Sequence, residues 1–484
     1  MRLPPTAKKP DPVQRLLVQP AFDSLPIALV QHAQAVPLGI LVRGTLEWLL
    51  DATIWEQIFH EQAPQQYTRQ LTMASLVGLL IQVSAGLRSS VFAAYKADQA
   101  ASQPTIATTQ QAVYGKLGRL NPAVSEALVR HSAAKLGQLL HGTVPATDDV
   151  LPGYRLRILD GNMLTGTDHR LKALRQWLNA CLPGKSLVVY EPGTRLVTDL
   201  VLCEDAYTQE RALLVHLLPH MQANDLWVAD RNFCTTRFVF GVPEKRGFFV
   251  VRQHGRTLRW KAVSKRKRCG PTDTGIVYEQ RIMATDPDSG EQLPLRRIEL
   301  RLFEKTGDGE RSIAVFTNLP DEVRAIAIVE IYRMRWTIEK QFPFLSQSLH
   351  CEVPGLGKPR AALFMFAMAL VASNALAVVR GALREAHGVE SESELSGFYL
   401  ADEIAHDYRT LMKYLPAEQW VGWRSLEAKA LKRLLIALSH KVNVAGLTRS
   451  KRGPKKPTGV KPMYDRKHKH RSTARLLKEA EDTC

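Results

Sequence analysis

Cysteine is scarce and scattered in this sequence, and a secretory signal is lacking. The six cysteines form no CxxC pair and no Cys/His cluster at zinc spacing. This argues against a structural zinc site or a disulfide framework and for a reducing, cytoplasmic compartment. The first thirty residues contain no sustained apolar core, so we expect no signal for secretion.

Long apolar runs are also rare. The stretch 361–379 carries no charge and is about long enough to cross a bilayer. It is rich in alanine and is interrupted by Ser373 and Asn374. We therefore expect a buried helix in a helical domain, and no membrane partner.

Acidic residues are outnumbered by basic ones. The 484-residue chain has 65 Lys and Arg against 47 Asp and Glu, a formal net charge of +18, while its hydrophobic fraction of 45% is ordinary for a folded protein. Such an excess of positive charge indicates a polyanion partner, and DNA or RNA ranks above a membrane surface. The length allows several domains, each with its own core.

Composition and periodicity indicate a multidomain α+β protein. An α/β core interrupted by a β-rich insertion is expected between helical N- and C-terminal regions. The expected segments are a loose leader at 1–35, a helical N-terminal domain at 36–150, the first part of the core at 151–245, a β-rich insertion at 246–318, the second part of the core at 319–380, a helical C-terminal region at 381–449 and a basic tail at 450–484.

Apolar runs give the expected strands. In the first part of the core they lie at 154–159, 186–191, 196–203 and 226–229, with a helix at 207–220 before the last of them. In the β-rich insertion the expected strands are 248–252, 257–262, 276–283, 297–303 and 312–317.

Three carboxylates stand out against this pattern. Asp160 follows the run 154–159, Asp230 follows the run 226–229, and Glu339 lies on an expected helix that begins at Ile331. Two Asp at the ends of neighbouring strands, with a Glu on a helix beside them, form an oxygen cage for two divalent ions. Two Mg²⁺ ions about 3.5–4 Å apart, with Mn²⁺ as a substitute, activate the nucleophile and stabilise the leaving oxygen of a phosphodiester. We predict that these three residues are catalytic and hold the metal ions.

The helix around Glu339 has a second feature. At 100° per residue, one apolar stripe would contain Ile331, Met334, Ile338, Phe342, Leu345 and Leu349. Tyr332, Arg335 and Glu339 would line its border, with Arg335 binding phosphate oxygens and Tyr332 contacting the same DNA strand. The alternative is an ordinary Arg335–Glu339 salt bridge on a solvated edge.

Other acids and aromatics are weaker candidates. Asp168, Asp199 and Asp205 also lie near expected strand ends, but no uninterrupted apolar run precedes them. For Trp336, Trp260 and Phe303 we expect packing in a core rather than stacking on DNA bases.

Basic residues gather in two places. Lys265, Arg266, Lys267 and Arg268 lie in an expected loop of the insertion, where contact with DNA phosphates and simple solvation are both open. The tail contains Arg452, Lys455 and Lys456, and its Gly and Pro residues disfavour a helix. An arm lying along DNA phosphates is the expectation, and a solubility tail is the alternative.

The ordered set Leu159-Asp160-Gly161, Ala229-Asp230-Arg231-Asn232-Phe233 and Tyr332-x2-Arg335-x3-Glu339 resembles the DDE transposases of bacterial insertion sequences. It is most similar to the family with a Tyr-Arg-Glu-Lys signature and a β insertion before the third acid, from about residue 36 to the basic tail. The resemblance implies a ribonuclease-H-like core that carries the three acids. It also implies cut-and-paste transposition, often through a DNA hairpin, by a nucleoid-associated homodimer whose helical N-terminal domain binds the terminal inverted repeats and which joins the ends to target DNA.

One position departs from that family. Ser346 stands seven residues after Glu339, where the family has lysine. Lys340 lies on a different side of the expected helix, whereas His350 returns to nearly the face of Glu339, and Pro343 between them is expected to kink the helix. The sequence therefore leaves open whether cleavage passes through a hairpin or is direct.

Two further functions remain open. A structure-specific endonuclease on the same core would nick without joining, and an inactive remnant would bind DNA only. The insertion and the basic tail favour transposition over the first, and the context of all three acids favours catalysis over the second.

Overall fold

The computed structural model describes residues 27–66, 70–101, 104–140, 151–164, 183–255, 257–307, 309–353 and 355–449. The chain divides into two units, Met1–Thr448 and Arg449–Cys484, and of the second only Arg449 is described. The leader up to residue 26 and the basic tail, with Arg452, Lys455 and Lys456, lie outside the described residues, so the expectations for them stay predictions.

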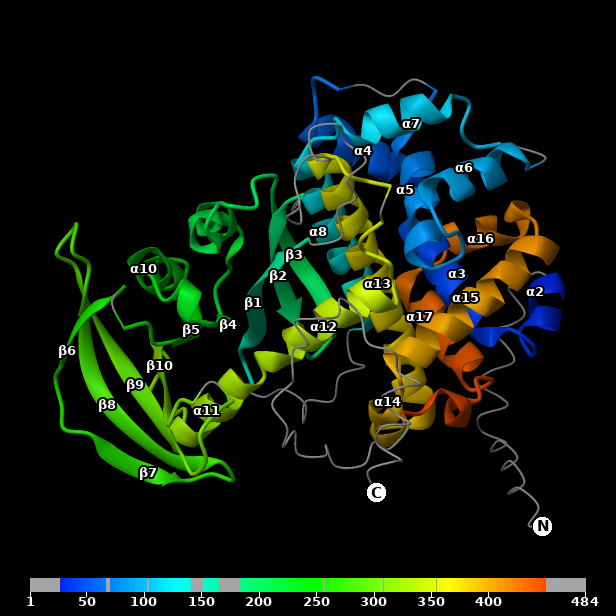
Figure 1. Ribbon diagram of the computed structural model, residues 1–484. Coiled ribbons are helices and arrows are strands. Elements are labelled where there is room, and N and C mark those ends of the chain that lie inside the picture. The colour runs from blue at the N-terminus through cyan, green and yellow to red at the C-terminus, as the bar shows by residue number, and fades with distance from the viewer. Residues whose placement is uncertain are drawn as a thin grey trace, which may run out of the picture. The chain divides into compact units, whose positions relative to one another are not determined.

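Ten strands of the described residues form one sheet (Figure 1). They are β1 Arg155–Met163, β2 Lys185–Glu191, β3 Leu196–Cys203, β4 Asp225–Ala229, β5 Phe248–Arg252, β6 Arg259–Ala262, β7 Lys267–Pro271, β8 Gly275–Thr285, β9 Gln292–Leu302 and β10 Ser312–Thr317. Their order is β3-β2-β1-β4-β5-β10-β9-β8-β6, with β7 paired to β8. Strands β1, β4 and β5 run parallel, and all other neighbours run antiparallel.

The strands of the β-rich segment continue the sheet of the core. β10 pairs with β5 on one side and with β9 on the other, so hydrogen bonds run unbroken from β1 to β8. The expected strands 248–252 and 312–317 have the bounds that the sequence predicts. β7 corrects the prediction, because Lys267 and Arg268 lie in a strand and not in a loop. This short, polar strand has no apolar alternation to reveal it, and it forms only through pairing with β8.

The N-terminal segment is helical, as predicted. Its helices are α2 Ile27–His32, α3 Pro37–Leu49, α4 Ala52–Gln62, α5 Met73–Ser84, α6 Val91–Gln99, α7 Gln110–Leu117 and α8 Pro122–Leu140. Side chains of Asp51, Thr72, Ser90 and Thr109 accept hydrogen bonds from first-turn amides and so start α4 to α7. The end of the expected leader is also ordered, since α2 lies in it and Leu29 is fully buried.

Helices pack on both faces of the sheet. α11 Ala325–Arg333 and α12 Trp336–Gln347 lie on one face, together with α8 and α13 Pro359–His387. The short turns η2 Glu210–Leu213, α9 Leu214–Leu217, η3 Leu218–His220 and η4 Arg231–Phe233, followed by α10 Thr236–Glu244, cover the other face. The expected helix 207–220 is therefore mostly 3₁₀, with a single α turn. Pro219 within it has no amide to donate.

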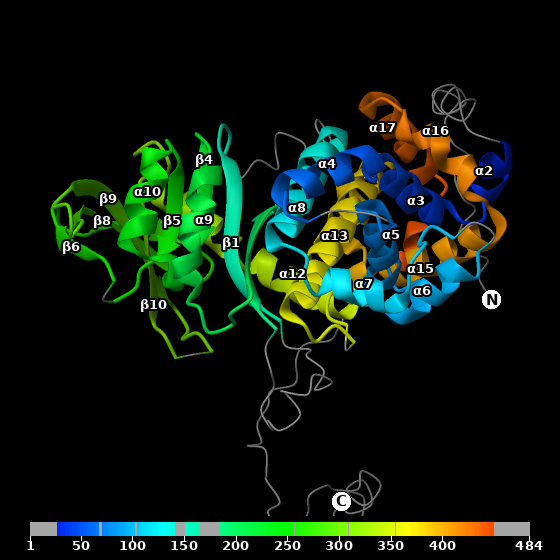
Figure 2. The same ribbon diagram turned by 90° about the horizontal axis from the view of Figure 1, so that it is seen from above.

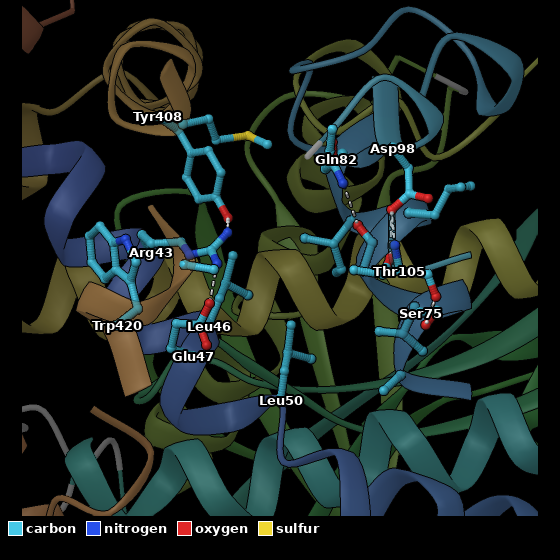
Figure 3. A pocket seen from close by; sticks show the side chains of 18 of the residues that line it. Arg43, Leu46, Glu47, Leu50, Ser75, Gln82, Asp98, Thr105, Tyr408 and Trp420 are labelled. Atoms are coloured by element: carbon cyan, nitrogen blue, oxygen red, sulfur yellow. Dashed lines mark hydrogen bonds and ion pairs between the residues drawn. The ribbon is translucent and has the colours of Figure 1, made fainter. Parts of the chain in front are cut away.

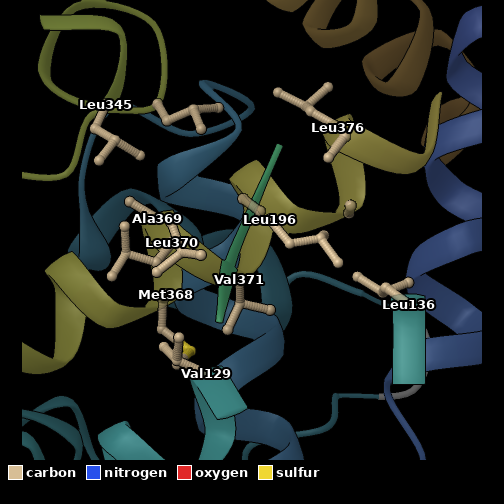
Figure 4. Close-up of a cluster of buried hydrophobic side chains, with 14 of the residues drawn as sticks. Val129, Leu136, Leu196, Leu345, Met368, Ala369, Leu370, Val371 and Leu376 are labelled. Carbon is tan, nitrogen blue, oxygen red and sulfur yellow. The ribbon is translucent and has the colours of Figure 1, made fainter. Parts of the chain in front are cut away.

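The remaining helices are α14 Val389–Glu394, α15 Gly397–Tyr414, η5 Ala417–Trp420, α16 Val421–Arg424, α17 Ala428–Ser439 and η6 Val444–Leu447. α14 and α17 pack against α13, whereas α15 and α16 pack against α3 (Figure 2). Among the described residues α13 alone is long and apolar enough to span a membrane, but 94% of its apolar window is buried inside the protein. Figure 4 shows Met368 and Val371 of α13 beside Val129 of α8. The prediction of a buried helix at 361–379 is confirmed.

A single buried amide fixes α13 against the edge of the sheet. Asn374 is fully buried and accepts a hydrogen bond from the amide of Val197 on β3 (2.8 Å). Its side-chain nitrogen donates to the carbonyl of Val197 (3.0 Å) and to Oγ of Ser132 on α8 (3.0 Å). β3 ends the sheet, so these bonds pair backbone groups that no neighbouring strand reaches.

Replacing Asn374 with alanine is expected to lower the free energy of unfolding by about 1–3 kcal/mol, because both backbone groups of Val197 would remain buried and unpaired. Urea unfolding followed by tryptophan fluorescence measures this. The neighbouring Ser373→Ala is the control, and an equal loss in both variants would show that the amide has no special role.

A buried carboxylate joins α15 to the start of α3. Asp407 is buried and accepts a hydrogen bond from the amide of Gly39 (3.1 Å). Burial raises the pKa of Asp407 to about 6, although the amides of Gly39 and Leu38 act in the opposite direction. Because the folded pKa exceeds the ordinary value of 3.8, folding favours the protonated form. The stability that this group contributes is present below about pH 4 and is lost as the pH rises through about 6.

Asp407→Asn is therefore expected to raise the thermal midpoint at pH 8 and to leave it nearly unchanged at pH 4. Scanning calorimetry across this range checks the trend. Asp402→Asn, at an exposed position of the same helix, is the control. A pH-independent effect of Asp407→Asn would contradict the expectation.

Candidate active site

The two strand-associated acids lie side by side at one edge of β1 and β4. These strands are parallel neighbours, and Leu159 is paired with Ala229. Asp160 and Asp230 are the next residues of the two strands, so the register brings them to the same level. β1 does not end at Asp160, however, but continues along β2 to Met163. Only its pairing with β4 ends there.

Strand alternation decides which face Asp160 occupies. Ile158 belongs to the core cluster that contains residues of α11, α12 and α13, whereas Leu159 belongs to the cluster of α9 and α10. Asp160 therefore lies on the face of Ile158. There Nη1 of Arg335 lies 3.4 Å from Oδ2 of Asp160, and Nη2 of Arg335 lies 2.7 Å from Oε1 of Glu339.

The helix that carries Glu339 is not continuous, which corrects the prediction. α11 ends at Arg333 and α12 begins at Trp336. In the turn between them the amide of Arg335 donates to the carbonyl of Tyr332 (3.1 Å), and the amide of Ile338 donates to the carbonyl of Arg335 (3.2 Å). These i to i−3 bonds tighten the winding locally while keeping right-handed dihedral angles.

The predicted apolar stripe faces the same core on both sides of this tighter turn. Ile331, Ile338, Leu345 and Leu349 are buried, and Met334 and Phe342 pack against the same core partly exposed. The stripe thus holds both helices on the sheet, and the Arg335–Glu339 pair points to its edge.

The three acids are close enough to affect one another. The pKa of Asp160 is raised to about 6, first by burial and then by the charges of Asp230 and Glu339, while Arg335 and the amide of Gly161 act in the opposite direction. The side chain of Asp160 is 17% exposed and that of Glu339 is 48% exposed. Tyr332 is buried beside them, shares a hydrogen bond with Arg335, and has a pKa that burial raises.

Arg335 now supplies the positive charge between the acids. Among the described residues no three Asp, Glu, His or Cys side chains are drawn together closely enough to hold a metal ion. The donor set still suits one, because carboxylate oxygens are the ligands that Mg²⁺ prefers and crowded carboxylates need a cation. Nε of Arg335 is buried without a hydrogen-bond partner within the described part of the chain, so one N–H remains for an acceptor.

Asp230 starts the short turn η4. Its Oδ1 accepts a hydrogen bond from the amide of Asn232 (2.5 Å), and Phe233 anchors the turn in the core, fully buried. The next residue, Arg231, lies 3.6 Å from Glu310, which also pairs with Arg252. Guanidinium groups therefore flank Asp230 on the side of β5 and β10.

The sequence analysis did not predict one acid of this region. Glu210 opens η2, and burial raises its pKa, with Lys185 lowering it and Asp230 raising it. Its carboxylate lies over Gly161, the residue after Asp160. No sequence signal points to Glu210, because it follows a polar stretch and only the fold brings it to Asp160 and Asp230.

The weaker acidic candidates do not join the site. Asp199 is buried and pairs with Arg130 (3.0 Å) and His220 (2.8 Å), which fixes β3 to α8 and η3. Asp205 is exposed and accepts a hydrogen bond from the amide of Tyr207 (2.9 Å). Asp168 lies outside the described residues.

The substitutes for the missing lysine are also displaced. α12 ends at Gln347, and His350 has a positive φ of 41° and lies beside Gly86, so the prediction that it returns to the face of Glu339 is wrong. Ser346 is exposed and donates to the carbonyl of Pro343 (3.1 Å). Lys340 is the only basic residue of α12.

Two of the three aromatic predictions are wrong. Trp336 is 46% exposed at the first turn of α12, and Phe303 is 62% exposed beyond the end of β9. Both lie outside the apolar stripes of their elements, so neither is packed in a core. Trp260 is confirmed as a packing residue, since it contacts Phe316 edge to face at 5.8 Å.

The basic cluster of the β-rich segment has mixed environments. Arg266 lies 3.2 Å from Glu299 and 4.8 Å from the ring of Tyr278, whereas Lys265, Lys267 and Arg268 are exposed. Glu299 also pairs with Arg297 and Arg301. Three guanidinium groups around one carboxylate leave this face of β8 and β9 positive.

A cavity lies elsewhere, in the helical part of the chain. It has a volume of about 660 Å³ and none of the three acids lines it. Figure 3 shows its polar side chains turned toward one another, with Arg43 donating to Tyr408 (2.5 Å) and paired with Glu47. The acid site lies instead at the junction of β1 and β4.

Replacing Arg335 with glutamine is expected to lower the free energy of unfolding by about 1–3 kcal/mol. This is less than for a fully buried pair, because Glu339 is half exposed. Asp160→Asn in the same chain is expected to restore much of that loss, because it removes the carboxylate left unpaired. Urea unfolding at pH 8 measures both effects.

Arg333→Gln is the matched control, because Arg333 pairs with Glu330 and Asp273 at the surface (3.1 Å each). It is expected to cost about 0–1 kcal/mol. Equal losses for Arg333→Gln and Arg335→Gln would show that the acid site does not depend on its buried guanidinium.

Comparison with known proteins gives a family match for the middle of the chain. Residues 151–374 match the family model described as the transposase DDE domain, a segment that contains all three acids. The InsL protein of the Escherichia coli K12 insertion sequence element IS186A is 23% identical over 269 residues, which cover 46% of this chain and 65% of InsL. The transposase of insertion sequence element IS421 from Escherichia coli is also 23% identical, over 46% of this chain and 64% of its own. The match thus spans just under two thirds of these relatives.

Among solved structures, the cryo-EM structure of the piggyBac transposase synaptic complex with hairpin DNA aligns with 79% of this chain and 83% of its own. The TM-score is 0.36 and the identity is 10%.

Proposed function

We propose, from the premise that residues 151–374 are a transposase DDE domain, that this chain is the transposase of a bacterial insertion sequence. It would bind the terminal inverted repeats, cut the DNA at the element ends and join the 3′ ends to target DNA. The observation that carries the proposal is the meeting of Asp160 and Asp230, on two parallel strands, with the Arg335–Glu339 pair of the helix beside them.

In this proposal Asp160, Asp230 and Glu339 are the catalytic carboxylates and hold two divalent ions, Mg²⁺ or its substitute Mn²⁺. The bound ions supply the charge that activates the nucleophile and stabilises the leaving oxygen. The raised pKa of Asp160, caused first by burial and then by its acidic neighbours, supports a site built for added positive charge.

Arg335 has two roles in this proposal. Its Nη atoms offset the charge of Asp160 and Glu339, and its unpaired Nε would donate to a phosphate oxygen of the DNA. Tyr332 would orient Arg335 through their hydrogen bond and contact the same strand. A guanidinium that binds carboxylates and phosphate through different N–H groups suits a site where a DNA strand lies against metal ligands.

The ribonuclease-H-like core is part of the proposal. Its support is the meander of β1, β2 and β3, which continues into the parallel strands β4 and β5 with the acids at the junction of β1 and β4. The segments at 151–245 and 319–380 would form this core, and that at 246–318 the insertion.

DNA would extend from the acids over the β-rich segment. Arg231 and Arg252 flank Asp230, and the arginines around Glu299 continue the positive surface. Lys265, Arg266, Lys267 and Arg268 would contact phosphates, together with Arg452, Lys455 and Lys456 of the tail. The helical domain at 36–150 would bind the inverted repeats, and a homodimer would hold two element ends in the bacterial cytoplasm.

Glu339→Gln and Asp160→Asn are each expected to slow cleavage of a labelled element-end fragment about 100-fold or more, because a ligand to the catalytic ions is lost. Cleavage in Mg²⁺ is followed on a denaturing gel, where a hairpin product differs in length from a direct cut. DNA binding in a mobility-shift assay is expected to persist in both variants.

Glu330→Gln is the matched control, because it removes an exposed carboxylate near the same turn. Binding without cleavage by the unaltered protein would leave a DNA-binding remnant. Cleavage without joining to target DNA would instead indicate an endonuclease.

A further inference from the structure

Glu210 is held in place on the face of the sheet opposite Arg335. Leu213, Leu214 and Leu217 of the following turns are buried in the same core cluster as Leu159 of β1. They fix the backbone of η2 over the end of β1. Within η2 and just before it, Gln209, Arg211 and Ala212 are exposed, while Glu210 is half-buried. The glutamate side chain is thus turned inward although its sequence neighbours face solvent.

The carboxylate of Glu210 fills the space that a side chain at position 161 would take. A Cβ placed on Gly161 would lie 2.3 Å from both Cδ and Oε1 of Glu210, too close for any atom pair. Gly161 does not have a positive φ, so its backbone does not require glycine. The reason for glycine here is room for Glu210. The amide of Gly161 in turn donates to Oδ1 of Asp160 (2.9 Å).

Glu210 is connected to the second acid through Asn232. The side chain of Asn232 lies close enough to Glu210 to lower the pKa of its carboxyl. The amide of Asn232 donates to Oδ1 of Asp230 (2.5 Å). Glu210 therefore contacts the turn that orients Asp230 and the strand that carries Asp160, from the side that Arg335 does not reach.

A purely structural role would not need a charged group here. The amide of glutamine could make the same contact with Asn232, and a carboxylate beside Asp230 adds repulsion that the buried Lys185 only partly offsets. This repulsion becomes an advantage when cations bind, because negative charge near the ligands strengthens their binding.

We propose that Glu210 is a fourth acidic residue of this site, a positioning residue that orients Asp230 through Asn232 and whose charge strengthens binding of divalent cations. The inference rests on the proposed function, and it concerns the face of the sheet that the three predicted acids leave unexplained.

The test measures Mn²⁺ binding to the full-length protein by the loss of the free-ion electron paramagnetic resonance signal. Glu210→Gln keeps an acceptor for Asn232 and removes the charge, and it is expected to weaken Mn²⁺ binding about tenfold. Glu210→Ala removes both and is expected to weaken it further, up to about 100-fold. Glu244→Gln removes an exposed charge from α10 and is the matched control.

Cleavage provides a second readout. Raising the Mn²⁺ concentration is expected to restore the activity of Glu210→Gln, whereas a variant with a damaged fold would not recover. Gly161→Ala is expected to displace Glu210 and to weaken Mn²⁺ binding as Glu210→Ala does. In the double variant that combines Gly161→Ala with Glu210→Ala, the added Cβ has room. The thermal midpoint of this double variant is therefore expected to exceed that of Gly161→Ala alone.

The outcomes separate this inference from the proposed function. If Glu210→Gln and Glu210→Ala bind Mn²⁺ like the unaltered protein, while Asp160→Asn and Glu339→Gln do not, the role of Glu210 is overturned and the transposase proposal stands. If the unaltered protein binds no Mn²⁺ and cuts no element-end fragment, both are overturned.

Discussion

The two ion pairs of Arg335 are the contact on which the candidate site depends. One guanidinium lies 3.4 Å from Asp160 on the sheet and 2.7 Å from Glu339 on α12. It joins a strand and a helix that are far apart in the sequence, and it balances carboxylates that would otherwise repel. Because the pair with Asp160 is largely buried, solvent screens it little, and the position of the helix and the charge of the site are coupled.

The sheet makes this contact possible. Parallel pairing of β1 with β4 sets Asp160 beside Asp230, and strand alternation turns Asp160 toward α11 and α12. The apolar stripe of these helices then brings Arg335 within reach of the sheet. The same alternation turns Gly161 toward the opposite face, where Glu210 lies over it. Two packed layers of helices thus place acidic groups on both faces of β1.

The crowding of these acids conflicts with stability but suits the proposed chemistry. Burial and like charges raise the pKa of Asp160, and Arg335 offsets this only in part. A site of this kind favours any ligand that brings positive charge. The arginines near Asp230 and around Glu299 favour a polyanion beside it. In the proposed function, this surface would bind cations at the acids and DNA phosphates around them.

The sequence by itself determined most of the strands and the buried helix, and it singled out the three acids, because apolar runs and their spacing act over a few residues. β5 and β10 have the predicted bounds, the run before Asp230 is buried throughout, and in the run before Asp160 only Ile158 and Leu159 are buried. Only the tertiary structure decided the break between α11 and α12, the exposure of Trp336, the strand β7 and the place of Glu210. Each of these depends on what packs against a residue from a distant part of the chain, and local periodicity carries no information about that partner.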